Sequence, residues 1–206
     1  MGEGAHLPRS AFEYHLMRVV GGRLKGRNLA SPSSRDIRPT ADRLRESLFN
    51  ILVHAYHDPI EGARVLDLFA GTGALGIEAV SRGAAFALFV DNGAEARALL
   101  RNNVEALGLG GVTKVYRRDA TNLGPAHPVE PFSLVFLDPP YAKALAEKAL
   151  ASLHDGGWLT PGALLVVEEA KAAVFAAPEG FGELERRVYD DTEFVFLQSV
   201  GRISKA

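Results

Sequence analysis

The sequence predicts an α/β protein whose mostly parallel sheet is covered by helices on both faces. Three observations support this fold class. Between residues 63 and 169, apolar segments of strand length alternate with longer segments of helical periodicity, which is typical of parallel sheets with helical connections. A glycine-rich turn follows the first of these strands, and aspartates follow several others. Because sheets of this kind bind ligands at the carboxyl ends of their strands, we expect the functional site at that edge.

The composition is that of an ordinary globular protein. The chain has 206 residues, of which 47% are apolar and 23% charged, so one domain with a small appendage can bury a core without covalent staples. It contains no cysteine, which excludes disulfides and thiolate metal sites and predicts a cytoplasmic protein. Its apolar runs are too short to span a membrane, no secretory signal pattern is present and the histidines are scattered, so we expect neither a membrane partner nor a metal.

The N-terminal part is expected to form a small extension. Residues 1–16 show no periodicity and are expected to be a leader or a disordered segment. Residues 18–30 indicate two short strands around a Gly-Gly pair, which is a hairpin signal, and residues 31–40 form a loop rich in Ser and Pro. A helix is predicted over residues 40–56, where apolar side chains recur at helical spacing: Leu44, Leu48, Ile51, Leu52 and Ala55.

The remaining elements follow in regular alternation. The predicted strands are 63–69, 85–91, 112–120, 132–138 and 163–169, and the predicted helices are 74–83, 94–108 and 142–157. Gly83 and Gly108 close the first two of these helices. A turn at Asp190 and Asp191 separates two last strands within residues 184–199, and we expect this hairpin to add an antiparallel edge to the sheet.

Basic side chains concentrate in the N-terminal extension. From Met17 to Arg45, eight basic and two acidic residues give a charge of +6, whereas the whole chain carries −2. Because phosphate neutralisation dominates nucleic-acid affinity, this segment predicts contact with a polyanion, although a solvated charged face would give the same pattern. We therefore divide the chain into a leader (1–16), a basic extension of hairpin and helix that we expect to bind nucleic acid (17–58) and the α/β domain (59–206).

The glycine turn indicates a nucleotide-like cofactor. Gly71-Thr72-Gly73, with Gly76, matches the G-x-G-x-x-G pattern of dinucleotide sites, in which the turn faces a pyrophosphate. Asp67 lies at the mouth of this turn and would repel phosphate. It would attract the ammonium group of S-adenosylmethionine, which has no phosphate, so these residues favour that cofactor over NAD.

Two further aspartates extend this interpretation. Asp91 lies 18 residues after Gly73, where a carboxylate suits the hydroxyls of a ribose. Asp119 ends the third predicted strand and suits an adenine amino group. Each aspartate alone can equally be a cap or turn residue, but three of them at successive strand ends favour a cofactor site.

The segment Asp138-Pro139-Pro140-Tyr141 points to the chemistry. An exocyclic amine on a nucleobase is a poor nucleophile because its lone pair is delocalised into the ring. The Asp138 carboxylate and the Pro139 carbonyl can accept its two hydrogens, since residues before proline stay extended, and Tyr141 offers a stacking surface. Pro140 has no N–H group to compete for these acceptors. The segment predicts methyl transfer to an exocyclic amine by positioning and electrostatics.

Several segments resemble a known family. "DLFAGTG" (67–73) and "DPPY" (138–141) look like class I S-adenosylmethionine-dependent methyltransferases, whose Rossmann-like fold is a seven-stranded, mostly parallel sheet with an antiparallel last strand. "MRVVGGRLKGRNL" (17–29) and "RPTADRLRESLFNIL" (38–52) closely resemble the bacterial 16S ribosomal RNA guanine-N2 methyltransferases of the RsmD type. Residues 1–16 lie outside this similarity.

The resemblance implies a substrate, a cofactor and the residues that bind them. The substrate would be a guanine of 16S RNA in an assembled or partly assembled small ribosomal subunit, and the cofactor S-adenosylmethionine. The amine-orienting residues would be Asp138, Pro139, Pro140 and Tyr141. The cofactor-binding residues would be Asp67, Phe69, Gly71, Thr72, Gly73, Asp91, Asn92, Asp119 and Ala120. The RNA-binding residues would be Arg18, Arg23, Lys25, Arg27, Arg38, Thr40, Arg43 and Arg45.

Some alternatives stay open. Arg43 and Arg45 on the predicted helix can equally pair with acids of the α/β domain. Adenine-N6 methyltransferases of DNA or RNA share the "DPPY" pattern, an NAD-dependent oxidoreductase would share the glycine turn, and a non-catalytic RNA-binding or assembly factor would keep the fold. Since no long apolar surface helix suggests obligate dimerisation, a monomer is expected.

Overall fold

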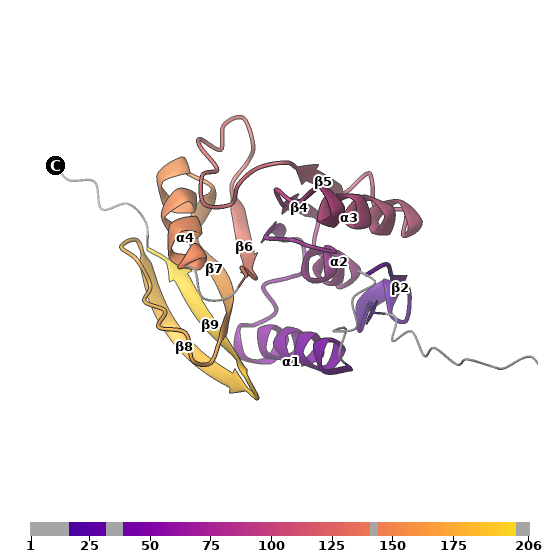
Figure 1. Cartoon of the computed structure of the whole chain (residues 1–206), viewed down its shortest axis with the longest axis horizontal. Helices are drawn as coiled ribbons and strands as arrows, with labels where there is room; N and C mark the ends of the chain where they lie inside the picture. Colours follow the sequence, from indigo (N-terminus) through magenta and orange to yellow (C-terminus); the bar gives the residue numbers. More distant parts are fainter. Residues whose placement is uncertain (1–16, 32–38, 141–143, 201–206) are drawn as a thin grey trace, which may run out of the picture.

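A computed structural model describes residues 17–31, 39–140 and 144–200 of the chain. A seven-stranded sheet runs through its centre with strand order β5-β4-β3-β6-β7-β9-β8, and helices cover it (Figure 1). The strands are β3 (Arg64–Leu68), β4 (Phe86–Val90), β5 (Thr113–Tyr116), β6 (Phe132–Leu137), β7 (Leu159–Ala170), β8 (Phe181–Tyr189) and β9 (Thr192–Ser199).

The strand directions follow the predicted pattern with one change at the edge. Strands β3 to β7 are parallel, and the last strand, β9, pairs antiparallel with both β7 and β8. The predicted turn at Asp190 and Asp191 connects β8 to β9. The antiparallel strand is nevertheless not the edge: β9 lies between β7 and β8, so β8 forms the edge and runs parallel to β7.

Two apolar cores fill the space on either side of the sheet. Helices α1 (Pro39–Ala55), α2 (Ala74–Ser81) and α3 (Ala94–Ala106) cover one face, and α4 (Leu145–Gly156) covers the other (Figure 1). Alternate residues of each strand enter the two cores, since Phe136 and Val166 pack on the α1 side whereas Leu137 and Val167 pack on the α4 side. This period of two is what a sheet covered on both faces requires.

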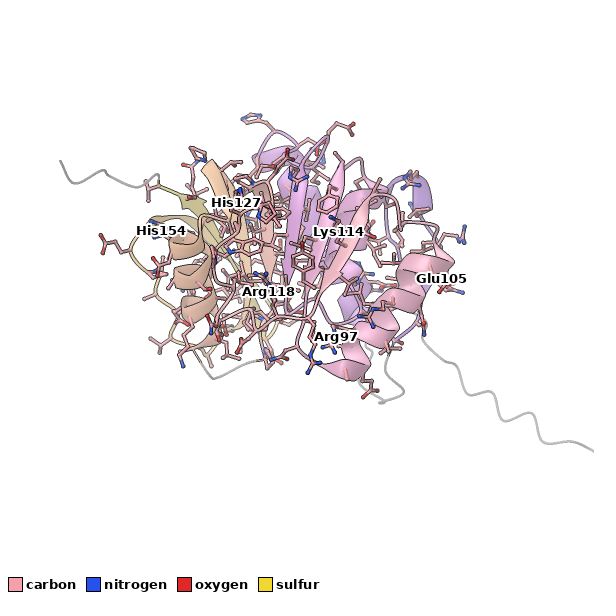
Figure 2. The ribbon with its side chains drawn as sticks, turned by 90° about the horizontal axis from the view of Figure 1, so that it is seen from above. Arg97, Glu105, Lys114, Arg118, His127 and His154 are labelled. Atoms are coloured by element: carbon pink, nitrogen blue, oxygen red, sulfur yellow. The ribbon has the colours of Figure 1, made fainter. Side chains whose placement is uncertain are left out.

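Strand β5 is shorter than predicted. It ends at Tyr116 rather than at Ala120, because the Asp119 carboxylate accepts hydrogen bonds from the backbone N–H and the hydroxyl of Thr121, at 2.9 and 2.7 Å, and forms a local turn. The segment after it crosses the α4 face as a loop. Arg118 (Figure 2) holds this loop, since its guanidinium lies over the ring of Trp158 and donates to the Leu123 carbonyl at 2.6 Å.

The N-terminal hairpin is smaller than predicted and packs on α2 and α3. Its strands, β1 (Met17–Arg18) and β2 (Asn28–Leu29), are joined by a loop containing a short 3₁₀ turn at Gly22–Leu24 instead of a tight Gly-Gly turn. Glycine is required at Gly22, where φ is +69° and a Cβ atom would lie 2.0 Å from a carbonyl oxygen of α2. Asn103 of α3 fixes the other end by exchanging hydrogen bonds with both backbone groups of Ala30.

A buried group of charges joins this hairpin to the helices, and we call Asp42, Arg45, Glu78 and Arg82 the charged clamp. The Glu78 side chain is fully buried and accepts hydrogen bonds from Val20 N at 2.8 Å and from Arg82 Nε at 2.7 Å. Arg45 lies 3.7 Å from Glu78 and 2.7 Å from Asp42, and it also donates to the Arg18 carbonyl. Every charge of the clamp therefore has an opposite charge beside it.

Candidate active site

The site lies at the topological switch point of the sheet. From β3 the chain proceeds outward to β4 and β5 and then returns to β6 on the other side of β3, which opens a crevice at the carboxyl ends of these strands. Asp67 is the penultimate residue of β3, and Asp91 and Asp138 directly follow β4 and β6. Three of the four predicted strand-end aspartates therefore lie along one edge.

The glycine turn between β3 and α2 is built as the pattern predicts. Gly71 and Gly73 have φ angles of +54° and +79°, and a Cβ atom at Gly73 would lie 2.2 Å from Leu100, so only glycine fits that position. Phe69 also has a positive φ, of +58°, which is uncommon for a non-glycine residue and typical of binding sites. Because Gly71 and Gly73 have no side chains, the turn exposes its backbone at the carboxyl edge of the sheet.

Asp91 supports this turn directly. Its carboxylate accepts hydrogen bonds from Gly71 N at 2.9 Å and from Gly93 N at 2.7 Å. The amide of Gly71, which a pyrophosphate-binding turn would offer to its ligand, is therefore already used by a carboxylate. This hydrogen bond adds a structural argument to the electrostatic one against a dinucleotide.

Asp67 is a buried acid beside the first turn of α2. It is 1% exposed and accepts a hydrogen bond from Gly76 N at 2.9 Å. Burial raises the pKa of its carboxyl well above the usual range, the Gly76 amide opposes this rise, and the nearby Asp138 and Asp91 add to it. Within the described residues, neither Asp67, Asp91 nor Asp138 forms an ion pair. A positively charged ligand would relieve this accumulation of negative charge.

Two cavities meet along this edge. They share Phe69, Gly71, Asp138 and Glu168 as lining residues. The larger cavity, of about 420 Å³, is completed by Asp91, Asn92, Pro139 and Pro140. The smaller cavity, of about 190 Å³, is completed by Met17, Leu44, Arg45, Leu48, Asp67, Ala70, Thr72, Ala74, Leu75 and Phe194. Asp138 therefore faces both cavities. The larger cavity is bounded by the glycine turn and the Pro-Pro pair, and the smaller one by the glycine turn, α1 and the hairpin.

Asp138 has an unusual environment for an acid that reaches solvent. Its side chain is open to the two cavities, yet protein atoms surround it and limit its hydration. This desolvation, together with the negative charge of Glu169, raises the pKa of its carboxyl from 3.8 to about 6. Pro139 is buried, Pro140 is exposed, and Tyr141 lies outside the described residues.

The predicted adenine-binding pair lies elsewhere. Asp119 is exposed, three residues beyond the end of β5, and its carboxylate is used in the turn at Thr121. Ala120 is buried in the core on the α4 side. Neither residue lines the two cavities. The expectation that Asp119 closes a strand was wrong, because β5 ends at Tyr116. The contact of Asp119 with adenine stays a prediction.

One acid of the site, Glu168, and its neighbour on the opposite face of the sheet, Glu169, were not predicted. Glu168 lines both cavities from β7, and its neighbour Glu169 is 5% exposed on the opposite face, where burial and Glu147 raise its pKa. The rule that identified the aspartates, an acid at the end of an apolar strand, also applies to "LLVVEE" (164–169). The signal was present, but two adjacent acids point to opposite faces of a strand, and the sequence alone does not say which one faces a ligand.

The predicted RNA-binding residues divide into exposed and buried ones. Arg18, Arg23, Lys25, Arg27 and Arg43 are exposed. Arg45 is 5% exposed and belongs to the charged clamp while also lining the smaller cavity, so its pairing with an acid of the α/β part, left open by the sequence, is what the structure shows. Arg38 lies outside the described residues, and nothing of the Thr40 side chain is described.

Neither a metal centre nor a membrane helix is found in the described part of the chain. No group of three or more His, Cys, Asp or Glu side chains within residues 17–31, 39–140 and 144–200 is placed to hold a metal ion. Over the same residues, none of the helices combines the length and the apolar character needed to cross a bilayer.

Comparison with known proteins places the chain among methyltransferases. Residues 17–198 match the protein family described as conserved hypothetical protein 95. The ribosomal RNA small subunit methyltransferase D of Escherichia coli strain K12 is 40% identical over 152 residues, which are 74% of each protein. The solved structure of yhhF from Escherichia coli is 33% identical, with a TM-score of 0.75 over 91% of this chain and 99% of that one.

A more distant solved structure shares the fold alone. An rRNA methylase from Streptococcus thermophilus is 16% identical, with a TM-score of 0.54 over 72% of this chain and 96% of that one. The strand order and the antiparallel β9 agree with these likenesses. The predicted Rossmann-like methyltransferase fold, with seven strands and an antiparallel last strand, is confirmed.

Proposed function

The chain belongs to the family described as conserved hypothetical protein 95, and we propose that it transfers a methyl group from S-adenosylmethionine to the N2 amine of a guanine in small-subunit ribosomal RNA. The named relative is a methyltransferase of this RNA. The observation that carries the proposal is the row of acids around the glycine turn, of which Asp67 is buried and forms no ion pair with any described residue.

The residues present fit this cofactor. A buried carboxylate with a raised pKa suits a ligand that carries an ammonium and a sulfonium group, because each positive charge would lower the cost of ionising Asp67. Phe69, Gly71, Thr72 and Asn92 line the cavities on either side. When bound, S-adenosylmethionine would supply an activated methyl group on its sulfonium sulfur.

The protein's own contribution is to hold and polarise the amine. Asp138 and the carbonyl of Pro139 accept the two hydrogens of the amine, so that its lone pair points out of the base plane. The geometry favours this, since Asp138 separates the two cavities and Pro139 stands beside it in the larger one. The Asp138 carboxylate is the charged acceptor, and the positive charge that develops on the nitrogen strengthens the contact as the reaction proceeds.

The exposed basic side chains of the hairpin and α1 would contact RNA phosphates. Arg23, Lys25, Arg27 and Arg43 are exposed, and the hairpin lies beside the smaller cavity because Met17 lines it. A substrate presented by an assembled or partly assembled small subunit, a monomeric enzyme and a cytoplasmic location are parts of the same proposal.

One experiment tests this function. Purified protein is incubated with methyl-labelled S-adenosylmethionine and small-subunit particles from cells that lack the enzyme, and the labelled nucleoside is identified after digestion of the RNA. We expect N2-methylguanosine. Labelled N6-methyladenosine would reject the guanine assignment, and calorimetric binding of NAD but not S-adenosylhomocysteine would reject the cofactor.

The matched variant is Asp138→Ala. It should lose transfer by about 100- to 1000-fold, the usual cost of removing one acceptor or donor at the reacting centre, while S-adenosylhomocysteine still binds. Undiminished turnover by this variant would contradict the role of Asp138. A variant that restores ribosome maturation without methylating would instead support a non-catalytic assembly factor.

A further inference from the structure

Glu168 of β7 is an acid at the site that the proposed chemistry does not use. It lines both cavities, as Asp138 does, and is half-buried there. Both acids line the same two cavities, and the amine of the substrate needs only one carboxylate as an acceptor. A substrate with more hydrogen-bond donors than one amine would also use the second acid.

The sheet register places Glu168 beside Asp138. Leu137 of β6 pairs with Val167 of β7, so Asp138 and Glu168 are the next residues along two adjacent parallel strands, which lie about 4.8 Å apart. Glu168 also pairs with Phe194 of β9, whose side chain lines the smaller cavity. Its side of the sheet is that of Val166 and Phe136, the α1 side.

The chemistry of the two candidate bases differs at the atom next to the amine. Guanine presents the N2 amine and, adjacent to it, an N1–H donor. Adenine presents the N6 amine and, adjacent to it, an N1 atom with a free lone pair. Asp138 and the Pro139 carbonyl account for the amine hydrogens in both cases, so they do not distinguish the bases. A third acceptor placed next to Asp138 and the Pro139 carbonyl would distinguish the bases, because it would face the N1 atom. Enzymes that draw a base out of its stack read it along the Watson–Crick edge, which contains this atom.

We propose that the Glu168 carboxylate accepts the N1–H of the target guanine and so selects guanine over adenine. This inference rests on the proposed function, since it assigns a base-reading residue to the same site. Opposite guanine the carboxylate receives a hydrogen bond. Opposite adenine it would meet a lone pair, and two buried acceptors would be left facing each other, which is the less favourable arrangement.

Glu169 provides a matched control within the same strand. It carries the same charge one residue further, but its side of the sheet is that of Val167 and α4, and Glu147 is the acid that it meets there. Because successive side chains of a strand point to opposite faces, Glu169 acts on the site only through its field and has no path to the base.

The experiment compares guanine with 2-aminopurine at the position that the wild-type protein methylates. 2-Aminopurine keeps the amine at C2 but has an unprotonated N1 and a hydrogen in place of the C6 carbonyl, so it lacks the donor that Glu168 is proposed to read, and the change of its rate ratio on substitution of Glu168 isolates that donor from the missing carbonyl. Small-subunit RNA carrying either base at that position is prepared by ligation and reconstituted into particles. kcat/KM is then measured for the wild type and for the Glu168→Gln, Glu168→Asp and Glu169→Gln variants.

We expect the wild type to prefer guanine by about 100-fold, the usual value of one hydrogen bond to a charged group. In Glu168→Gln the amide can accept the guanine N1–H only as a neutral oxygen and can donate to the unprotonated N1 through its nitrogen, so the guanine rate should fall by about tenfold while the 2-aminopurine rate holds or rises, and the ratio approaches one. Glu169→Gln keeps the wild-type ratio. Calorimetry with S-adenosylhomocysteine verifies that each variant folds and binds the cofactor.

The other outcomes separate this inference from the proposed function. If Glu168→Gln lowers both rates by the same factor, or leaves the ratio unchanged, Glu168 does not read N1 and the inference is rejected. If Glu168→Gln does not fold, Glu168→Asp decides, since retracting the carboxylate by one methylene should reduce the ratio by about tenfold, and an unchanged ratio rejects the inference. Failure of the wild type to label any guanine would instead reject the proposed function.

Discussion

The charged clamp and the acidic edge of the sheet bury ionisable groups in opposite ways. In the clamp, Glu78 is fully buried but lies against Arg45 and Arg82. At the edge, Asp67 is equally buried, accepts a hydrogen bond from one backbone amide and has Asp91 and Asp138 as its charged neighbours. The two groups are connected through the smaller cavity, which both Arg45 and Asp67 line.

This difference separates structural charges from functional ones. A buried acid that already has its cations is satisfied by the protein, and its removal leaves those cations uncompensated. A buried acid among other acids keeps an unfavourable electrostatic energy in the free protein, which a cationic ligand reduces on binding. The comparison therefore predicts that equal substitutions at the two places change different properties.

The largest difference is expected between Glu78→Gln and Asp67→Asn, which remove one charge each with little change of shape. Glu78→Gln should lower the free energy of unfolding by about 3–5 kcal/mol, because Arg82 loses its acidic partner in the clamp and Arg45 keeps only Asp42. Asp67→Asn should leave it unchanged or higher, since the amide oxygen still accepts from Gly76 and no cation is left behind. Urea unfolding at pH 7 measures both.

Binding of S-adenosylhomocysteine should show the reverse order. Asp67→Asn should weaken it by about 10- to 100-fold through loss of a charged hydrogen-bond acceptor, whereas folded Glu78→Gln should bind it normally. If Glu78→Gln and Asp67→Asn lowered the free energy of unfolding equally, or bound S-adenosylhomocysteine with equal affinity, the distinction between the charged clamp and the acidic edge would be wrong.

A smaller effect is expected from pH. Since the pKa of Asp138 is raised from 3.8 to about 6 in the folded protein, the folded state holds a proton that the unfolded state has released. The stabilisation that Asp138 provides is therefore complete below pH 4 and is lost as the pH rises through 6. Urea unfolding of the wild type and of Asp138→Asn between about pH 4 and 7 should show this contribution declining in the wild type alone.

The catalytic activity should also follow the titration of Asp138, but it should increase with pH where the stabilisation decreases. The charged form of Asp138 accepts the amine hydrogens, so kcat/KM should rise with pH and level off above an apparent pKa near 6. Glu169→Gln removes a negative charge that raises this pKa, and the rise should then move to lower pH. A profile that does not respond to Glu169→Gln would show that another group limits the reaction.

The smallest effect concerns the surface. Replacing the exposed Arg23 and Lys25 of the hairpin together by Ala should leave the free energy of unfolding within about 0.5 kcal/mol. It should raise KM for the particle several-fold and reduce the slope of log affinity against log salt by about 1 for each phosphate that is no longer neutralised. Arg101→Ala, an exposed cation of α3 outside the basic segment, is the control and should leave the slope unchanged.

Much of the architecture follows from local pattern. The alternation of apolar strands and amphipathic helices determines the element order, and the glycines that close α2, α3 and α4 have positive φ angles where the sequence predicts helix ends. The predicted end of β5 was wrong because the Asp119 side chain forms a turn by hydrogen bonding to the backbone, and this turn competes with the hydrogen bonds between strands. Apolar periodicity carries no information about such local hydrogen bonds.

The site divides in the same way. Asp67, Gly71, Asp91 and Asp138 were predictable because a carboxyl-end position follows directly from where an apolar run stops. The burial of Arg45 in the charged clamp was not predictable, because it depends on Glu78, which lies 33 residues away along the chain. Glu168 and Glu169 were not, because only the register with β6 determines which of two adjacent acids faces the cavities.

Local sequence pattern is enough to establish the fold class, the glycine turn and the strand ends at which acids gather, because these features depend on periodicity and on conformations that only some residues adopt. Long-range packing establishes which buried charges have partners, where β9 inserts into the sheet and which glutamate lies beside Asp138. These are long-range outcomes, since a charge is compensated or left uncompensated by whatever distant segment packs against it.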